Sequence, residues 1–400
     1  MRKTLITIII LLILPINIAY AQEFNITSDN VILYNMNDSS ILYELDSEKE
    51  VNIASLTKIM TTIVAIENIK DLDEKVTVTK EAFNDISEYT QVGLKEGDIV
   101  TYKDLLYGIM LPSGADAVNA LALQLCGSNE KFVSLMNDKV KELGLKHTHF
   151  DNAIGMDSKE NYSSAKDVAE ILIYSLKNPT FKEIFTARTY KIEAINKNLN
   201  STLIGYSRSY GLDITNIDGA KSGYTDAAGL CLASTSTIDD VEYLLITIHA
   251  DTNNRSNAIR DSIEIYDYYS SNYGYHKVVN KNQEIKTIKI KWGKKETYRI
   301  KAPEDISLYL ENTIRKNRIK YKYNGIEEIT YKNKLGSKLG TVDVIYEGKT
   351  LTTFSVYLDE KLSFYHPVIY GIIIISFILM VTSLGVMREN KKKKNKKKKK

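Results

Sequence analysis

Residues 54–61 read Ala-Ser-Leu-Thr-Lys-Ile-Met-Thr, and the rest of the chain is organised around them. If a helix begins at Ser55, the i, i+3 spacing places Lys58 one turn above it on the same face, while the apolar residues fall on another face. Serine becomes a strong nucleophile when a base stands beside it. A lysine can be that base only when burial or a second cation lowers its pKa. The chain must therefore supply a second cation.

Two later stretches carry residues that could complete such a site. Residues 111–117 read Leu-Pro-Ser-Gly-Ala-Asp-Ala, a loop entering a helix, which could present the hydroxyl of Ser113. Residues 217–226 read Ile-Asp-Gly-Ala-Lys-Ser-Gly-Tyr-Thr-Asp, and we expect Lys221 and Ser222 at the end of a strand. Gly223 would let a substrate backbone approach closely, which a side chain would prevent. Together, in this order, the three stretches indicate one site.

Both ends of the chain predict contact with a membrane. Residues 1–21 combine two basic residues, an apolar run and an Ala-Tyr-Ala end, as in a cleaved secretory signal peptide; an uncleaved N-terminal anchor is the alternative. Residues 367–387 contain no charged residue and are long enough for one transmembrane helix. The Lys-rich tail, residues 388–400, is expected on the cytoplasmic side. We therefore predict a single-pass protein of the cell membrane whose globular part lies on the extracellular face.

Charge and cysteine content exclude several classes of protein. The formal net charge is +3, but without the two charges of Arg2 and Lys3 and the nine of the tail, residues 22–387 carry −8. This acidic balance gives no indication of a nucleic-acid partner. Cys126 and Cys231 lie in apolar stretches and predict buried thiols rather than a disulfide. No Cys/His cluster has metal-ligand spacing, so we expect no metal site. Nothing predicts a coiled coil, and the oligomeric state stays open.

The elements between signal peptide and anchor predict two domains, because about 345 residues exceed one ordinary core. Residues 22–275 predict an α+β catalytic domain, an antiparallel sheet covered by helices. Its expected elements are a hairpin at 31–44, helices at 56–69, 102–110, 115–126, 130–143 and 165–176, and strands at 229–236 and 241–249. Residues 276–362 predict a small all-β domain of sandwich type, with short alternating segments at 287–292, 297–301 and 342–346.

The three stretches resemble the signatures of the penicillin-recognising serine enzymes, which include penicillin-binding proteins and class A β-lactamases. The matching residues are Ser55-Leu56-Thr57-Lys58, Ser113-Gly114-Ala115 and Lys221-Ser222-Gly223. Their surroundings, including residues 152–155 and 162–165, are similar to the low-molecular-weight penicillin-binding proteins that are serine-type D-alanyl-D-alanine carboxypeptidases of peptidase family S11. The resemblance covers nearly the whole exported chain from about residue 31. It implies a β-lactamase/transpeptidase-like catalytic domain followed by a β domain and a C-terminal membrane anchor.

The resemblance implies roles in the reaction for four residues. Ser55 would be the acylated nucleophile and Lys58 its general base. Lys221 would be the second cation that keeps Lys58 neutral. Ser113 would relay a proton toward the leaving D-alanine.

Substrate-binding roles are also implied by the resemblance. The backbone N–H groups of Ser55 and Tyr224 would form an oxyanion hole. Ser222, where the family more often has threonine, would bind the terminal carboxylate beside Gly223. Arg255 is a second candidate for this carboxylate, and an ordinary surface charge is the alternative.

One position departs from the family pattern. The second signature usually ends in asparagine, whose amide contacts the lysine base and the substrate backbone, but the chain has Ala115 there and Asp116 next. A missing polar contact costs about 1–2 kcal/mol as an ordinary hydrogen bond. An alignment shifted by one residue would put Asp116 in the role of the asparagine, but on a helix its side chain would point about 100° away from that position. We therefore expect slower acylation or an altered substrate preference.

The resemblance predicts a D-Ala-D-Ala carboxypeptidase that cleaves the terminal D-alanine from peptidoglycan stem pentapeptides through an acyl-enzyme. β-Lactams would acylate the same serine, Ser55. A membrane-tethered, catalytically weak binder of peptidoglycan or β-lactams is the alternative that Ala115 favours. A β-lactamase is a further alternative, but such an enzyme needs a carboxylate aimed at the deacylating water and has no use for a β domain and an anchor.

Overall fold

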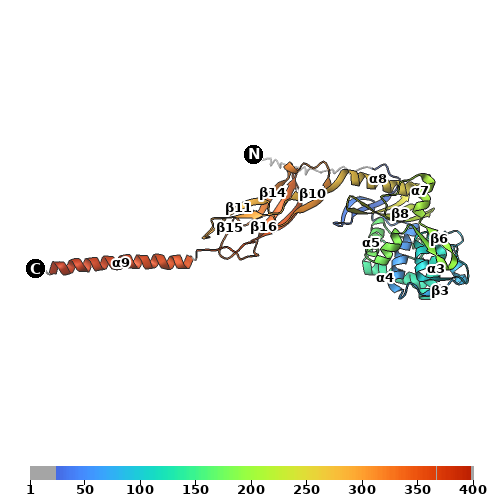
Figure 1. The fold of residues 1–400 in the computed structure, drawn as a ribbon, viewed down its shortest axis with the longest axis horizontal. Coiled ribbons are helices and arrows are strands. Elements are labelled where there is room, and N and C mark those ends of the chain that lie inside the picture. The colour runs from blue at the N-terminus through green and yellow to red at the C-terminus, as the bar shows by residue number, and fades with distance from the viewer. Residues whose placement is uncertain (1–23, 366, 398–400) are drawn as a thin grey trace, which may run out of the picture. The chain divides into compact units, whose positions relative to one another are not determined.

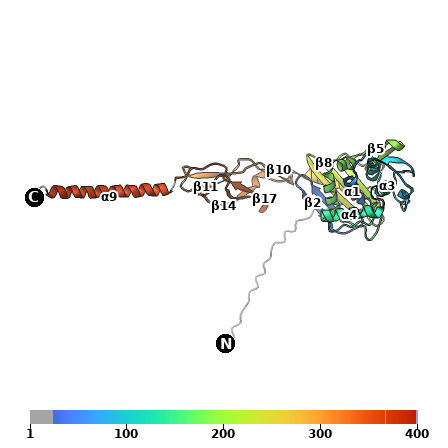
Figure 2. The same ribbon diagram turned by 90° about the horizontal axis from the view of Figure 1, so that it is seen from below.

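The computed structural model describes residues 24–365 and 367–397, and the chain divides into two compact units between Ser271 and Asn272. Figures 1 and 2 show the elements of each unit. The predicted signal peptide lies outside the described residues. The domain boundary predicted after residue 275 falls four residues beyond this division, inside strand β10 (Tyr273–Val279).

The first unit is built on a five-stranded sheet in the order β2-β1-β9-β8-β7, and every neighbouring pair is antiparallel. The predicted first hairpin and the predicted pair of later strands are confirmed. All six residues of β1 are buried, because the two strands that flank it and the helices on the sheet cover it completely. The strands are β1 (Asn30–Asn35), β2 (Ser40–Leu45), β7 (Gly219–Thr225), β8 (Gly229–Ile238) and β9 (Val241–Ala250).

Helices cover both faces of this sheet. On one face, alternate residues of β9, Leu244, Ile246 and Ile248, join the apolar core that contains α1 and α5. Odd-numbered residues of β9 face the other way: Tyr243 packs against Tyr266 of α8, and Thr247 donates a hydrogen bond to the Ala258 carbonyl of α8. The helices are α1 (Thr57–Asn68), α2 (Tyr102–Met110), α3 (Ala115–Cys126), α4 (Asn129–Leu143), α5 (Ala165–Leu176), α6 (Pro179–Thr186), α7 (Thr202–Tyr210) and α8 (Asn257–Asn272).

The five predicted helices are confirmed within one residue at each end, whereas α6, α7 and α8 were not predicted. Helix α7 has a single buried residue, Leu203, so it shows no apolar stripe. Polar residues such as Asp261 and Ser262 lie on the buried face of α8 and interrupt its periodicity. Short strand pairs complete the unit: β3 (Lys75–Thr77) with β4 (Ile99–Thr101), and β5 (Thr189–Ile192) with β6 (Lys197–Asn200).

The second unit begins as the predicted all-β domain. Its three small sheets run β10-β13, β12-β11-β15 and β14-β16-β17. Residues from the last two sheets share one apolar cluster that includes Ile288, Ile300 and Val342. The strands are β10, β11 (Glu284–Ile290), β12 (Thr297–Lys301), β13 (Ile306–Glu311), β14 (Lys320–Gly325), β15 (Glu328–Ile329), β16 (Lys338–Tyr346) and β17 (Lys349–Tyr357).

The last element is helix α9 (Pro367–Lys397). Residues Val368–Asn395 are long and apolar enough to cross a membrane, and the described side chains of this helix are exposed. This finding agrees with the predicted membrane anchor. The helix continues into the Lys-rich tail.

Candidate active site

Ser55 lies in a short 3₁₀ turn, Ala54–Leu56, that leads directly into α1. The i, i+3 spacing brings the Nζ of Lys58 within 2.9 Å of the Ser55 Oγ. Nine consecutive residues of α1 from Thr57 are buried, so the helix presents Lys58 from inside the core. The expected pairing of hydroxyl and amine is therefore present in the structure.

The backbone around Ser55 is held by two close approaches. Ala54 has φ +47°, in the left-handed region, where only glycine is free of steric cost. Gly155 lies against it: a Cβ there would be 2.0 Å from the Ala54 carbonyl oxygen. Gly223 approaches from β7, and a Cβ there would be 2.9 Å from the Ser55 nitrogen. Both positions therefore require glycine to keep the Ser55 backbone where it is.

Lys58 is 1% exposed, and its amine donates a hydrogen bond of 2.6 Å to the Ile154 carbonyl. The Asn152 side chain fixes this loop, because its Oδ1 accepts from the N–H groups of Ile154, Gly155 and Met156. Burial, and then the charge of Lys221, hold the pKa of Lys58 well below its ordinary value of 10.5. A lowered pKa favours the neutral amine, which is the form in which a lysine accepts a proton.

Lys221 is fully buried on β7, and its amine donates to the Ser222 carbonyl at 3.0 Å. Burial lowers its own pKa to about 7. The sequence placed Lys221 at the end of a strand, but it is the third of the seven residues of β7. The strand runs on to Thr225 because its partner β8 continues the antiparallel pairing that far.

Ser113 lies in the loop between α2 and α3, with φ +68°. Its hydroxyl donates a hydrogen bond of 3.0 Å to the Ser55 Oγ, and its side chain is buried. Ser55 Oγ thus lies between a buried amine and a second hydroxyl. This geometry allows one group to take the proton of Ser55 and another to hand a proton to a leaving group.

Ala115 and Asp116 are both fully buried at the start of α3. Ala115 packs into the apolar core. The Asp116 carboxylate accepts hydrogen bonds from the backbone N–H groups of residues 92–94 at 2.7–3.0 Å. Asp116 therefore fixes that loop and does not take the place of the usual asparagine, as the helix geometry predicted.

The remaining predicted residues lie along β7 and the loop before α8. Ser222 Oγ shares a hydrogen bond of 2.7 Å with the hydroxyl of Thr202, the first residue of α7. The Arg255 guanidinium stacks on the Tyr224 ring, 3.8 Å from its centroid. An open hollow of about 590 Å³ lies there, lined by Thr202, Gly205, Tyr206, Ser209, Tyr210, Tyr224 and Arg255.

The sequence indicated no role for Thr202, and it marked residues 152–155 only as a stretch similar to the family, without the contacts that Ile154 makes with Lys58 and Gly155 makes with Ala54. Thr202 follows no apolar periodicity, and Ile154 acts through its carbonyl, which every residue has. Among the described residues, no group of three or more His, Cys, Asp or Glu side chains could hold a metal ion. Cys126 and Cys231 are free thiols, but only Cys231 is buried as predicted, because Cys126 at the end of α3 is partly exposed. Burial raises the pKa of Cys231 to about 12.

Two family models match the chain. Residues 17–252 match the D-alanyl-D-alanine carboxypeptidase model of peptidase S11, and residues 273–363 match the C-terminal domain of penicillin-binding protein 5. The chain is 29% identical over 337 residues to D-alanyl-D-alanine carboxypeptidase DacF of Bacillus subtilis, covering 83% of this chain and 85% of that protein. It is 33% identical over 227 residues to the D-alanyl-D-alanine carboxypeptidase of Streptomyces sp. strain K15, covering 51% and 75%.

Solved structures share this architecture. Penicillin-binding protein 5 of Haemophilus influenzae aligns with a TM-score of 0.63 over 86% of this chain and 99% of that chain, at 24% identity, which supports the fold alone. The Streptomyces K15 DD-transpeptidase aligns with a TM-score of 0.57 at 28% identity, over 62% of this chain and 98% of that chain.

Proposed function

The chain belongs to the peptidase S11 family of serine-type D-alanyl-D-alanine carboxypeptidases, and from this membership we propose the substrate, the residue roles and the membrane orientation that follow. It is a penicillin-binding enzyme of cell-wall synthesis, and no metal or organic cofactor takes part in the proposed reaction. Its substrate is a peptidoglycan stem peptide ending in D-Ala-D-Ala.

Acylation begins at Ser55. Its Oγ attacks the carbonyl carbon of the penultimate D-alanine, and the neutral amine of Lys58, 2.9 Å away, takes the proton. The backbone N–H groups of Ser55 and Tyr224 stabilise the oxyanion; losing one such donor typically costs about 10²–10³ in rate. Ser113, 3.0 Å from Ser55 Oγ, relays a proton to the departing D-alanine. Water then hydrolyses the ester and restores Ser55.

Two groups bind the terminal carboxylate of the substrate. The Ser222 hydroxyl, oriented by Thr202, lies on the exposed side of β7 beside Gly223, and Arg255 supplies a positive charge from the adjacent loop. Stacking on Tyr224 holds the guanidinium in place while leaving its N–H groups available. β-Lactams occupy the same position and acylate the same serine.

The proposed domains follow the sequence prediction: a signal peptide at residues 1–21, a catalytic domain at 22–275 and a β domain at 276–362. A transmembrane helix at 367–387 and a cytoplasmic tail at 388–400 complete the chain, which places the catalytic domain on the extracellular face. Helix α9 supports the anchor, and the lysines after it favour a cytoplasmic C-terminus.

The observation that carries this proposal is the placement of the Ser55 Oγ between the buried amine of Lys58 and the hydroxyl of Ser113. The test incubates the full chain in detergent with a stem pentapeptide and, separately, with a fluorescent penicillin. Release of D-alanine with stable labelling, both lost in Ser55→Ala and kept in the exposed-serine control Ser134→Ala, is expected. Labelling without D-alanine release would indicate a tethered binder instead, and rapid turnover of penicillin would indicate a β-lactamase.

A further inference from the structure

The single tryptophan of the chain, Trp292, lies in the turn between β11 and β12. The turn is hydrogen-bonded to the segment that leads into α9. The Tyr365 N–H donates to the Trp292 carbonyl at 2.7 Å, and the Lys294 N–H donates to the Ser363 carbonyl at 2.9 Å. The tip of this hairpin is therefore fixed to the last residues of the β domain.

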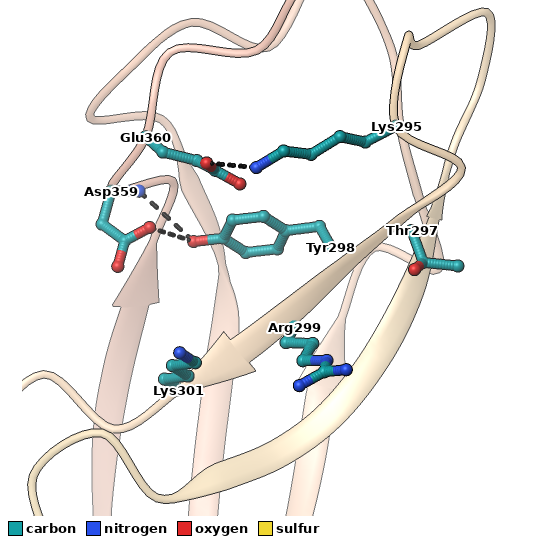
Figure 3. A pocket seen from close by; sticks show the side chains of 7 residues that line it. All are labelled: Lys295, Thr297, Tyr298, Arg299, Lys301, Asp359 and Glu360. Carbon is teal, nitrogen blue, oxygen red and sulfur yellow. Dashed lines mark hydrogen bonds and ion pairs between the residues drawn. The ribbon is translucent and has the colours of Figure 1, made fainter.

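Side chains strengthen this attachment. Lys295 forms an ion pair of 2.7 Å with Glu360, and the Tyr298 hydroxyl donates to Asp359 at 2.6 Å. Figure 3 shows both pairs bridging the hairpin and the segment that carries Asp359 and Glu360. The hairpin and residues 359–365 thus behave as one local structure.

Covalent connectivity places this tip close to the apolar span. The span begins at Val368, three residues after Tyr365, and three extended residues reach at most about 11 Å. The polar zone on each side of a bilayer core is roughly 5–8 Å thick. If α9 crosses the membrane, as proposed above, Trp292 therefore lies at or beside the headgroup region.

The exposed apolar side chains of the β domain gather at this end. Among the described residues of the β domain, six large apolar side chains are exposed. All of them except Tyr275 lie in the hairpin tip, in a segment hydrogen-bonded to it, or in a segment next to such a segment. Lys291 N–H donates to the Ile329 carbonyl just before Tyr331, and Gly336 N–H donates to the Leu358 carbonyl just after Tyr357. We call this set the apolar rim: Trp292, Tyr331, Leu335, Tyr357 and Tyr365.

Trp292 itself is 53% exposed and has φ +59°. A bulky residue rarely takes this left-handed conformation, and here the neighbouring Gly293 does not take it. The turn thus holds a large indole outward at a steric cost. Tryptophan and tyrosine are the side chains enriched where bilayer and water meet.

The β domain also carries an excess of basic residues, unlike the catalytic domain. Residues 273–365 contain 19 Lys/Arg and 11 Asp/Glu, whereas residues 22–272 contain 22 and 38. Around the apolar rim, residues 291–296, 328–338 and 357–365 carry seven lysines and four acidic residues. Basic residues beside a bilayer bind anionic headgroups.

We propose that the apolar rim and its lysines form a docking surface for the anionic phospholipids of the outer leaflet, with the Trp292 indole in the headgroup region. This inference rests on the proposed transmembrane anchor. The hairpin then gives the β domain a second attachment to the bilayer beside α9.

The tryptophan fluorescence of the chain comes from Trp292 alone, because the sequence holds no other tryptophan, so it reports on the environment of this side chain. The full chain is reconstituted in vesicles of phosphatidylcholine, with or without phosphatidylglycerol. Its emission is measured with lipids brominated near the top of the acyl chain and with aqueous acrylamide. We expect a blue-shifted emission, quenching by the brominated lipid and protection from acrylamide, all stronger with phosphatidylglycerol.

Charge-matched variants separate docking from mere proximity. Replacing Lys294, Lys332 and Lys334, which lie around the apolar rim, by Gln should abolish the effect of phosphatidylglycerol, and it leaves the Lys291–Glu328 and Lys295–Glu360 ion pairs in place. The control replaces Lys316, Lys320 and Lys349 by Gln; Lys349 is at the opposite end of β17 from Tyr357. We expect the control to keep the wild-type response. Equal responses of the two triple variants would overturn the proposed lysine contacts.

Carbonate extraction of the same vesicles tests the anchor separately. Protein that resists extraction while its tryptophan is quenched by acrylamide and not by brominated lipid would overturn the docking surface and leave the anchor standing. Protein that is extracted by carbonate would overturn both.

Discussion

Gly155 offers the sharpest test of how the backbone positions Ser55. It has φ +89°, and a Cβ would lie 2.0 Å from the Ala54 carbonyl oxygen and 3.0 Å from the Ser55 nitrogen. These are backbone atoms, so no side chain can rotate to make room. Gly155→Ala should therefore both strain residue 155 and push the nucleophile out of place.

The magnitude follows from two costs. A left-handed conformation costs a non-glycine residue about 1–2 kcal/mol, and overpacking costs about 1–3 kcal/mol. Their sum, about 2–5 kcal/mol, should lower the Tm of the catalytic unit by roughly 5–15 °C. A shift of Ser55 approaching 1 Å should slow acylation about 10²-fold.

The assay combines thermal unfolding, followed by circular dichroism, with the rate of acylation by a fluorescent penicillin. Gly144→Ala is the matched control, because Gly144 has φ +69° but nothing within 4 Å of its Cβ position. It should show the conformational cost alone, with acylation unchanged. If Gly155→Ala is no less stable than Gly144→Ala and acylates at the wild-type rate, the proposed backbone contact does not position Ser55.

Three further predictions concern the charged and polar groups of the site. Lys221 has a folded pKa of about 7 against 10.5 unfolded, so the unfolded chain binds more protons between these values. The free energy of unfolding should therefore rise with pH across this window by up to about 1.4 kcal/mol per pH unit. In denaturant titrations at several pH values, Lys221→Met should show a smaller increase of the unfolding free energy with pH. Removing the charge of Lys221 should also raise the pKa of Lys58, so that the acylation rate begins to rise at a higher pH than in the wild type. Thr202→Val removes the partner of Ser222 and should weaken kcat/KM for the pentapeptide by about fivefold, the worth of one hydrogen bond, whereas an unchanged value would show that Thr202 does not orient Ser222. Asp116→Asn should cost about 2–4 kcal/mol in urea unfolding, because a charged acceptor of three backbone N–H groups is lost; a loss of acylation without loss of stability would instead place Asp116 in the reaction.

Local spacing was enough to predict the part of the site at the start of α1. Ser55 lies in the 3₁₀ turn that leads into α1, and Lys58 follows three residues later in the first turn of the helix, so the spacing alone brings the two side chains together. Helix geometry also correctly predicted that the Asp116 side chain does not take the position of the usual asparagine. The antiparallel sheet and five of its helices were likewise predictable, since their apolar periodicity matches the face that each buries.

Contacts between distant segments were not predictable in this way. The Ile154 carbonyl reaches Lys58 across 96 positions in sequence, and backbone atoms leave no compositional signal. Thr202 meets Ser222 because α7 packs on β7, and α7 itself has only Leu203 buried. Lys221 and Ser222 were expected at the end of a strand, but antiparallel pairing with β8 continues β7 to Thr225.

The central claim is that Ser55 is the residue acylated, with Lys58 as its base. The most direct measurement is mass-spectrometric mapping of the penicilloyl adduct on the full chain, alongside Ser55→Ala and Lys58→Met. We expect one adduct, on the peptide that contains Ser55, absent from Ser55→Ala and formed far more slowly in Lys58→Met. An adduct on another residue, or D-alanine release by the Ser55→Ala protein, would contradict it.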